Sequence, residues 1–186
     1  MKKLLFLSLL LVSCSQQNSE VSETNEGNPL YFTTMTHMEE NFTDDSDENL
    51  FDRHVEQIRY AIELFDEYGA KLTIETAEPF AVANEKWNLN IMKEVLEAGH
   101  GVGTHCGGIV PTEKDVAVKI YAQKLEDMKS LVDELVGAEN NQGCSGGMGS
   151  SDWVMATSKA GFKFLDGVTA FAYLSMDESK RPEGFT

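Results

Sequence analysis

Histidine and acidic side chains stand at the ends of several short apolar segments of this chain. His37 and Glu39 end the first segment, Glu75 the second, His105 the third and Asp166 the fifth. Imidazole nitrogens and carboxylate oxygens suit a divalent metal, with zinc as the first candidate, and such a site keeps a position open for water. A bound ion of this kind activates water and polarises a carbonyl group. These residue types therefore indicate a metal site able to activate water.

The spacing of these residues is not a compact metal signature such as His-Glu-x-x-His, so a second interpretation stays open. In that interpretation hydrogen bonds satisfy the four histidines of the chain, and the carboxylates face solvent. His54 lies on the apolar stripe of a predicted helix, where a core or rim position is usual. His100 follows the helix-ending Gly99, so we expect it to cap or pack a turn.

The metal interpretation depends on a fold that brings the segment ends together. From Leu30 onward, β-branched or aromatic runs alternate with helical patterns, which indicates an α/β fold with a parallel sheet or barrel. In such folds the site forms at the carboxyl ends of the strands. His37 and Glu39 are two positions apart, so they point to one side of a strand. The expected strands cover residues 30–38, 70–75, 101–105, 141–145 and 161–166.

The helices expected between these strands are predicted from apolar residues spaced three and four apart and from capping residues. They cover 51–65, ended by Gly69; 88–98, ended by Gly99; a long helix opened by Thr112 with Asp115 and running to Leu135; and 153–160, capped by Ser150 or Ser151. Trp153 begins the last of these helices, and it either packs in the core or offers a flat wall to a sugar ring. Trp153 and Asp166 are therefore the candidate substrate-binding residues.

The first fourteen residues have the pattern of an export signal. Lys2 and Lys3 precede a short apolar run, 4–12, which is too short to cross a hydrocarbon core of roughly 30 Å. The segment that ends at Cys14 resembles the lipobox of bacterial lipoproteins, in which the cysteine is lipidated; an ordinary signal peptide is the alternative. The polar stretch 15–28 predicts a flexible tether. We therefore expect a cell-envelope lipoprotein, periplasmic or anchored in the outer membrane, that contacts the membrane through its lipid anchor only.

The composition limits the partners of the remaining domain, 29–186. The chain has 186 residues, with 15 Lys and Arg against 31 Asp and Glu, and a formal net charge of −16. A surface of this charge is unsuited to nucleic acid. Apart from the lipobox cysteine, the chain has Cys106 and Cys144. In an oxidising compartment these two residues could form a disulfide or stay as two buried thiols.

The segment Glu97-Ala-Gly-His-Gly-Val-Gly-Thr-His105 resembles the polysaccharide deacetylase family, also known as the NodB-homology fold or carbohydrate esterase family four. There a helix ends in Gly-His-Glu-Ile-Gly-x-His, and the last histidine binds a metal. Tyr-Gly-Ala-Lys-Leu-Thr, at 68–73, is similar to the second strand of that family. The resemblance covers about residues 30 to 170. It implies an incomplete (β/α) barrel and metal-assisted hydrolysis of N- or O-acetyl groups on a polysaccharide. The five βα steps also make an incomplete eight-fold barrel, so we expect the sequence to be truncated at its C-terminal end.

The chain departs from the family pattern at several catalytic positions. Thr36-His-Met-Glu39 stands where the family has Thr-Phe-Asp-Asp, so Met38 replaces the base and Glu39 keeps the ligand position. The second family histidine falls at Ile109, and the family Arg-x-Pro-Tyr segment is absent. The resemblance therefore carries over His105 and Glu39, and His37 would complete a rebuilt ligand set.

Two functions follow from this comparison. The first is a metal-dependent hydrolase that removes acyl groups, by amide or ester hydrolysis, from an envelope or extracellular polysaccharide. In it His37, Glu39 and His105 hold a divalent metal, Glu39 and Glu75 are the catalytic carboxylates, and Glu40 is an alternative base. The second is an inactive deacetylase-fold lipoprotein that binds carbohydrate.

Overall fold

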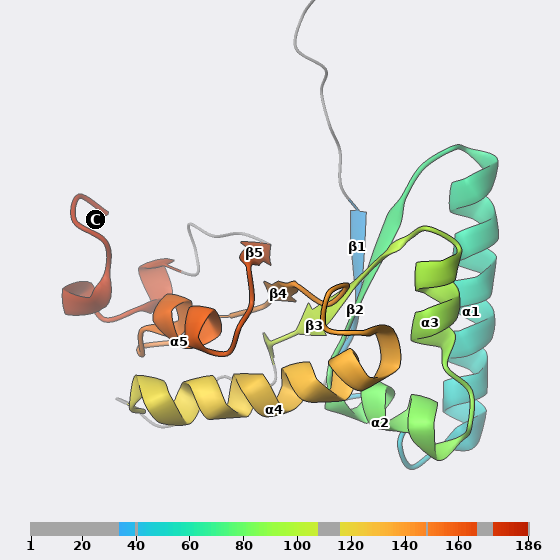
Figure 1. The fold of residues 1–186 in the computed structure, drawn as a ribbon, viewed down its shortest axis with the longest axis horizontal. Helices are drawn as coiled ribbons and strands as arrows, with labels where there is room; N and C mark the ends of the chain where they lie inside the picture. The colour runs from blue at the N-terminus through green and yellow to red at the C-terminus, as the bar shows by residue number, and fades with distance from the viewer. Residues whose placement is uncertain (1–33, 40, 108–115, 148, 167–172, 186) are drawn as a thin grey trace, which may run out of the picture. The chain divides into compact units, whose positions relative to one another are not determined.

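Five parallel strands form the central sheet of the described part of the chain (Figure 1). This computed structural model describes residues 34–39, 41–107, 116–147, 149–166 and 173–185, all within the unit Phe32–Thr186. The strands are β1 (Thr34–Met38), β2 (Leu72–Thr76), β3 (Gly101–His105), β4 (Gly143–Ser145) and β5 (Phe164–Asp166). They pair in sequence order, with β1 and β5 at the two edges of the sheet. The predicted α/β class with a parallel sheet is confirmed.

The strand boundaries differ little from those expected. β3 has the predicted limits, whereas β2 is shifted toward its carboxyl end and β4 and β5 are shorter than predicted. Residues 30–33 of the first expected strand lie outside the described residues. The carboxyl-terminal end of every predicted strand lies within one residue of its observed end, and these ends carry the candidate site residues.

The helices are α1 (Glu48–Glu67), α2 (Glu78–Lys86), α3 (Ile91–Glu97), α4 (Val118–Val136) and α5 (Trp153–Lys159), followed by the short 3-10 helix η2 (Glu178–Lys180). The sequence did not predict α2. The predicted helix 88–98 is shorter than expected because Asn90 caps α3 by accepting a hydrogen bond from Lys93. Asp152, rather than Ser150 or Ser151, caps α5. Thr112 and Asp115 lie outside the described residues.

Two hydrophobic clusters join the helices to the sheet. The first packs α1, α2 and α3 against β1 and β2 through residues such as Phe51, Ile74 and Phe80. The second contains Trp153 and Tyr121 and joins α4 to α5 and to the ends of β3 and β4. Met38, at 4% exposed, packs in the first cluster, so alternate residues of β1 face the helices. Among the described helices, none is long and apolar enough to cross a membrane.

A disulfide joins Cys106, directly after β3, to Cys144 in β4. The Cα atoms are 5.8 Å apart, and the backbone N–H of Cys106 donates a hydrogen bond to the carbonyl of Ser145. The sequence left the choice between a disulfide and two free thiols open, because strand register cannot be read from a single chain. The bond fastens the two strand ends beside His105.

Reduction of this disulfide should lower the free energy of unfolding by about 2–4 kcal/mol, because the bond closes a long loop of the unfolded chain. Chemical denaturation with a chelator present, with and without dithiothreitol, measures the difference. The Cys106→Ala/Cys144→Ala double variant is the control and should not respond to the reductant. Equal stability of the wild-type protein in both conditions would contradict the assignment.

Candidate metal centre

The face of the sheet opposite the helices carries a layer of polar side chains near the carboxyl ends of the strands. His37 of β1 is in register with Glu75 of β2. His105 of β3 is in register with Ser145 of β4, which is in register with Asp166 of β5. The alternation of a strand, which sends Met38 toward the helices, sends His37 to the opposite face. Residues from all five strands thus meet in one layer.

His37, Glu39 and His105 form a cluster that could hold a metal ion, since one ligand atom from each lies within 4.8 Å of the others. His105 Nε2 is 3.1 Å from Glu39 Oε2, and His37 Nδ1 is 3.6 Å from Glu39 Oε1. The two imidazole rings stack with centroids 4.2 Å apart. These are the three residues that the sequence predicted as ligands, and the fold brings them together.

The donor set fits a divalent cation of the zinc type. Two imidazole nitrogens and one carboxylate are a common ligand set of catalytic zinc sites, which leave the fourth position open for water. The side chain of Glu39 is 40% exposed, whereas that of His105 is 7% exposed, so the cluster has one open side and one buried side. The three residues present therefore match the chemistry of an open, three-ligand metal site.

Glycines on neighbouring segments make room for these side chains. A Cβ atom at Gly107 would lie 2.6 Å from His105 Nε2, and one at Gly146 would lie 2.7 Å from His105 Cε1. A Cβ atom at Gly103 would lie 3.1 Å from both Cγ and Oε1 of Glu75. The glycines of these segments therefore allow the backbone to approach the polar layer closely.

Glu75 is the most deeply buried carboxyl group of this layer, at 1% exposed. Burial, a hydrogen bond to the Asp166 side chain and repulsion by its charge raise the pKa of Glu75 to about 8, and a hydrogen bond with Ser145 opposes this shift. The Asp166 carboxyl group lies close to that of Glu75, and two neighbouring carboxylates disfavour each other's charged form. Glu75 Oε2 also lies 3.2 Å from His37 Nε2.

Ser145 is a member of the layer that the sequence did not identify. Its Oγ lies 3.0 Å from His105 Nδ1, and its side chain also contacts the Glu75 carboxyl group. A serine at a strand end is too common to stand out in a single sequence. The register of β3 and β4 was the missing information, since it places Ser145 beside His105.

The other predicted site residues have varied outcomes. Asp166 joins the polar layer through Glu75, whereas Trp153 is 2% exposed and packs in the second hydrophobic cluster. The core role of Trp153 is thus the one that the structure displays, and its ring has no open face for a sugar. Glu40 and Cys14 lie outside the described residues.

The two remaining histidines have structural partners. His54 Nδ1 lies 2.6 Å from Oδ1 of Asp44, and its ring packs against Phe42. His100 Nδ1 accepts a hydrogen bond from the backbone N–H of Leu72. Both placements agree with the rim and turn-capping positions expected from the sequence. Neither histidine belongs to the metal cluster.

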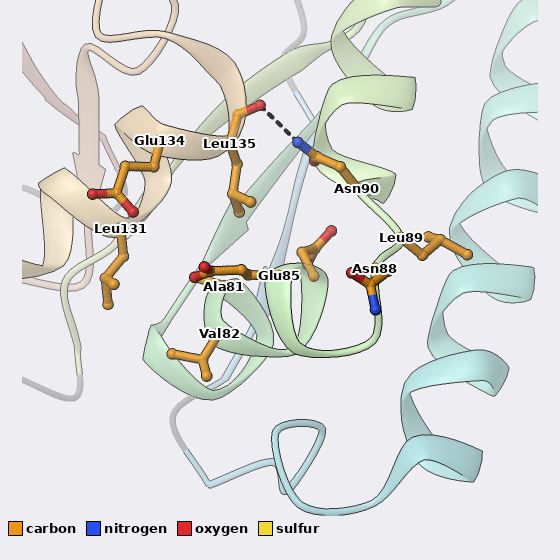
Figure 2. A pocket seen from close by; sticks show the side chains of 10 residues that line it. Ala81, Val82, Glu85, Asn88, Leu89, Asn90, Leu131, Glu134 and Leu135 are labelled. Atoms are coloured by element: carbon orange, nitrogen blue, oxygen red, sulfur yellow. Dashed lines mark hydrogen bonds between the residues drawn. The ribbon is translucent and has the colours of Figure 1, made fainter.

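A separate cavity of about 440 Å³ lies in the helix layer between α2 and α4. Figure 2 shows Glu134 and Leu131 of α4 on one side and Glu85 and Ala81 of α2 on the other. Asn90, which precedes α3, donates a hydrogen bond from Nδ2 to the carbonyl oxygen of Leu135 in α4, with 2.8 Å between the two atoms (Figure 2). The residues that line this cavity include none of the predicted site residues, so the polar layer is the better candidate site.

Comparisons with protein-family models, curated proteins and solved structures gave no match. The assignment of chemistry therefore depends on the residues of the polar layer.

The raised pKa of Glu75 should make the stability of the metal-free protein depend on pH. Between pH 4.5 and about 8 the folded protein keeps a proton on Glu75 that the unfolded chain releases. The native state then binds more protons, so the contribution of Glu75 to stability is present below this window and is lost as pH rises through it. Denaturation curves at pH 5 and pH 8 in excess chelator should show a larger fall for the wild type than for Glu75→Gln. An equal fall in both proteins would refute this assignment.

Proposed function

We propose that the chain is a metal-dependent hydrolase that removes acyl groups from an envelope or extracellular polysaccharide. The observation that carries the proposal is the convergence of His37, Glu39 and His105 on one open-sided cluster. Zinc is the proposed metal, because two imidazoles and one carboxylate match its catalytic ligand sets. The reaction is hydrolysis of a carbon–nitrogen bond of an amide, or of an ester.

The bound metal would supply an activated water and polarise the acyl carbonyl. The chain's own residues would provide the ligand atoms and accept the proton of the activated water. Glu39 has two carboxylate oxygens, one directed at each histidine, and its partial exposure lets one of them accept a proton at the open side. Glu75 has a pKa suited to proton transfer, but its oxygens lie against His37, Ser145 and Asp166 in the buried part of the layer.

Phe164 offers an exposed aromatic ring for a sugar at the amino-terminal end of β5, two residues before Asp166. Its side chain is 57% exposed and lies across Gly143, where a Cβ atom would come within 2.5 Å of the ring. With Glu75 and Asp166 it lines a cavity of about 420 Å³. An exposed aromatic face beside carboxyl groups suits a saccharide, which offers both apolar C–H faces and hydroxyl groups. We therefore propose Phe164, and not the buried Trp153, as the aromatic residue for sugar binding.

We further propose that the fold is an incomplete barrel of the polysaccharide deacetylase type. The sequential order of the parallel strands agrees with a barrel, in which each strand pairs with the next along the chain. Lipidation at Cys14 and a tether over 15–28 would hold this domain at the cell envelope. The protein would then contact the membrane through its lipid anchor only. The acidic composition supports a glycan rather than nucleic acid as the partner.

One observation favours the alternative function, a carbohydrate-binding protein without catalysis. Met38 stands at the family's base position, and its side chain is buried among the helix-side core residues instead of facing the polar layer. A deacetylase that lost its base would keep the groove and lose turnover. The two functions share the binding surface and differ in metal binding and hydrolysis.

The full chain, purified in detergent, should bind about one zinc ion per molecule by elemental mass spectrometry. Because each removes a proposed ligand, His105→Ala and Glu39→Gln should each weaken zinc binding more than about 100-fold, beyond the range typical of residues that only support a ligand. Glu63→Gln, an exposed glutamate of α1, is the matched control and should bind like the wild type.

Acetate release from an N-acetylated glucosamine oligomer and from an O-acetylated glycan then tests the reaction. The wild type loaded with zinc should release acetate from one of them, and Glu39→Gln should not. Binding of the oligomers without zinc binding or hydrolysis would contradict the hydrolase and support the carbohydrate-binding alternative.

A further inference from the structure

We propose that Glu75 is the positioning residue that orients both histidines of the metal site, His37 by direct contact and His105 through Ser145. This inference rests on the proposed function for the metal cluster itself. It assigns to one buried carboxyl group the supporting contacts of two ligands that come from different strands.

The ring nitrogens divide into two pairs. His37 Nδ1 and His105 Nε2 are the nitrogens that face Glu39, at 3.6 and 3.1 Å from its oxygens. A nitrogen that binds a metal must be unprotonated, so the proton of each neutral ring must stand on the other nitrogen. Those other nitrogens are His37 Nε2 and His105 Nδ1, and each needs an acceptor to fix the tautomer and the orientation of its ring.

The His37 branch ends directly on Glu75. His37 Nε2 lies 3.2 Å from Glu75 Oε2, and both atoms are buried. Neither atom makes a hydrogen bond to any of the residues that the structure describes. Metal binding at Nδ1 would keep the proton on Nε2 and give Glu75 Oε2 the donor that it lacks. The contact therefore satisfies two buried polar atoms at once.

The His105 branch reaches the same carboxyl group through a hydroxyl. His105 Nδ1 lies 3.0 Å from Ser145 Oγ, and the Ser145 side chain interacts with the Glu75 carboxyl group. A serine hydroxyl can accept one hydrogen bond and donate another, so Ser145 can accept from Nδ1 and donate to the carboxyl group. The two histidines thus depend on one acceptor.

Glu75 is held in a place where it can serve both branches. It stands on β2, between the strands of the two histidines, and Gly103 leaves the space that its side chain fills. A carboxyl group at 1% exposure costs stability, and an apolar residue would be the ordinary choice inside a sheet. Carboxylate–histidine–metal contacts are a general means of fixing ligand orientation, which accounts for a carboxyl group here.

Glu75→Leu tests the proposal because it removes both oxygens and keeps most of the side-chain volume. Competition with a chromophoric zinc chelator should give an affinity about 10–100-fold below that of the full-length wild type. The metal-free variant should unfold at a denaturant concentration no lower than the wild type, because a buried carboxyl group has been replaced by an apolar one. Glu75→Gln keeps an acceptor oxygen and should recover most of the lost affinity.

A double-mutant cycle with Ser145→Ala tests the shared acceptor. Ser145→Ala removes one branch and should weaken zinc binding less than Glu75→Leu does. The double variant should bind about as weakly as Glu75→Leu alone, because Ser145 acts through Glu75. Glu63→Gln serves again as the exposed control.

The outcomes separate this inference from the proposed function. If the wild type binds zinc and Glu75→Leu binds it with the same affinity, the positioning role is overturned and the metal site stands. The same conclusion follows if the effects of Glu75→Leu and Ser145→Ala on zinc affinity are fully additive in the double variant. A Co²⁺ absorption spectrum that shows one ligand fewer in Glu75→Leu would also overturn it, since Glu75 would then be a ligand. Absence of zinc binding in the wild type would refute both proposals together.

Discussion

The burial of the Glu75 carboxyl group is the constraint on which the rest of the polar layer depends. A carboxyl group in the interior of a sheet is costly unless its oxygens have partners. Gly103 provides the space, while Ser145, Asp166 and His37 provide the polar contacts. Each of these residues faces the same buried carboxyl group. The layer is therefore one connected unit rather than a set of separate side chains.

The alternation of side chains along each strand separates this unit from the hydrophobic core. Consecutive residues of β1 show the division, since His37 enters the polar layer and Met38 packs among the helices. At the ends of β3 and β4 the same division joins chemistry to stability. His105 and Ser145 form the polar side, while the disulfide between Cys106 and Cys144 fastens the backbone on the core side. The core and the disulfide thus hold the strand ends that carry the ligands.

Much of the cluster could be predicted from the sequence, because strand ends and residue parity are local properties. The positions of His37, Glu39 and His105 at predicted strand ends were sufficient to place them together. Strand register is not local, so the sequence could neither identify Ser145 as a partner of His105 nor decide the disulfide. The burial of Trp153 was equally hidden, since an aromatic residue that begins a helix can face either the core or solvent. The helix α2 was missed because its short segment has weak apolar periodicity.

The most direct test of the central claim is the location of the metal itself. Crystals of the zinc-loaded protein, measured at the zinc absorption edge, would show the ion by its anomalous scattering. The account predicts one strong peak about 2.0–2.2 Å from a nitrogen of His37, a nitrogen of His105 and an oxygen of Glu39. A peak bound by other residues, or a polar layer without a peak at saturating zinc, would contradict it.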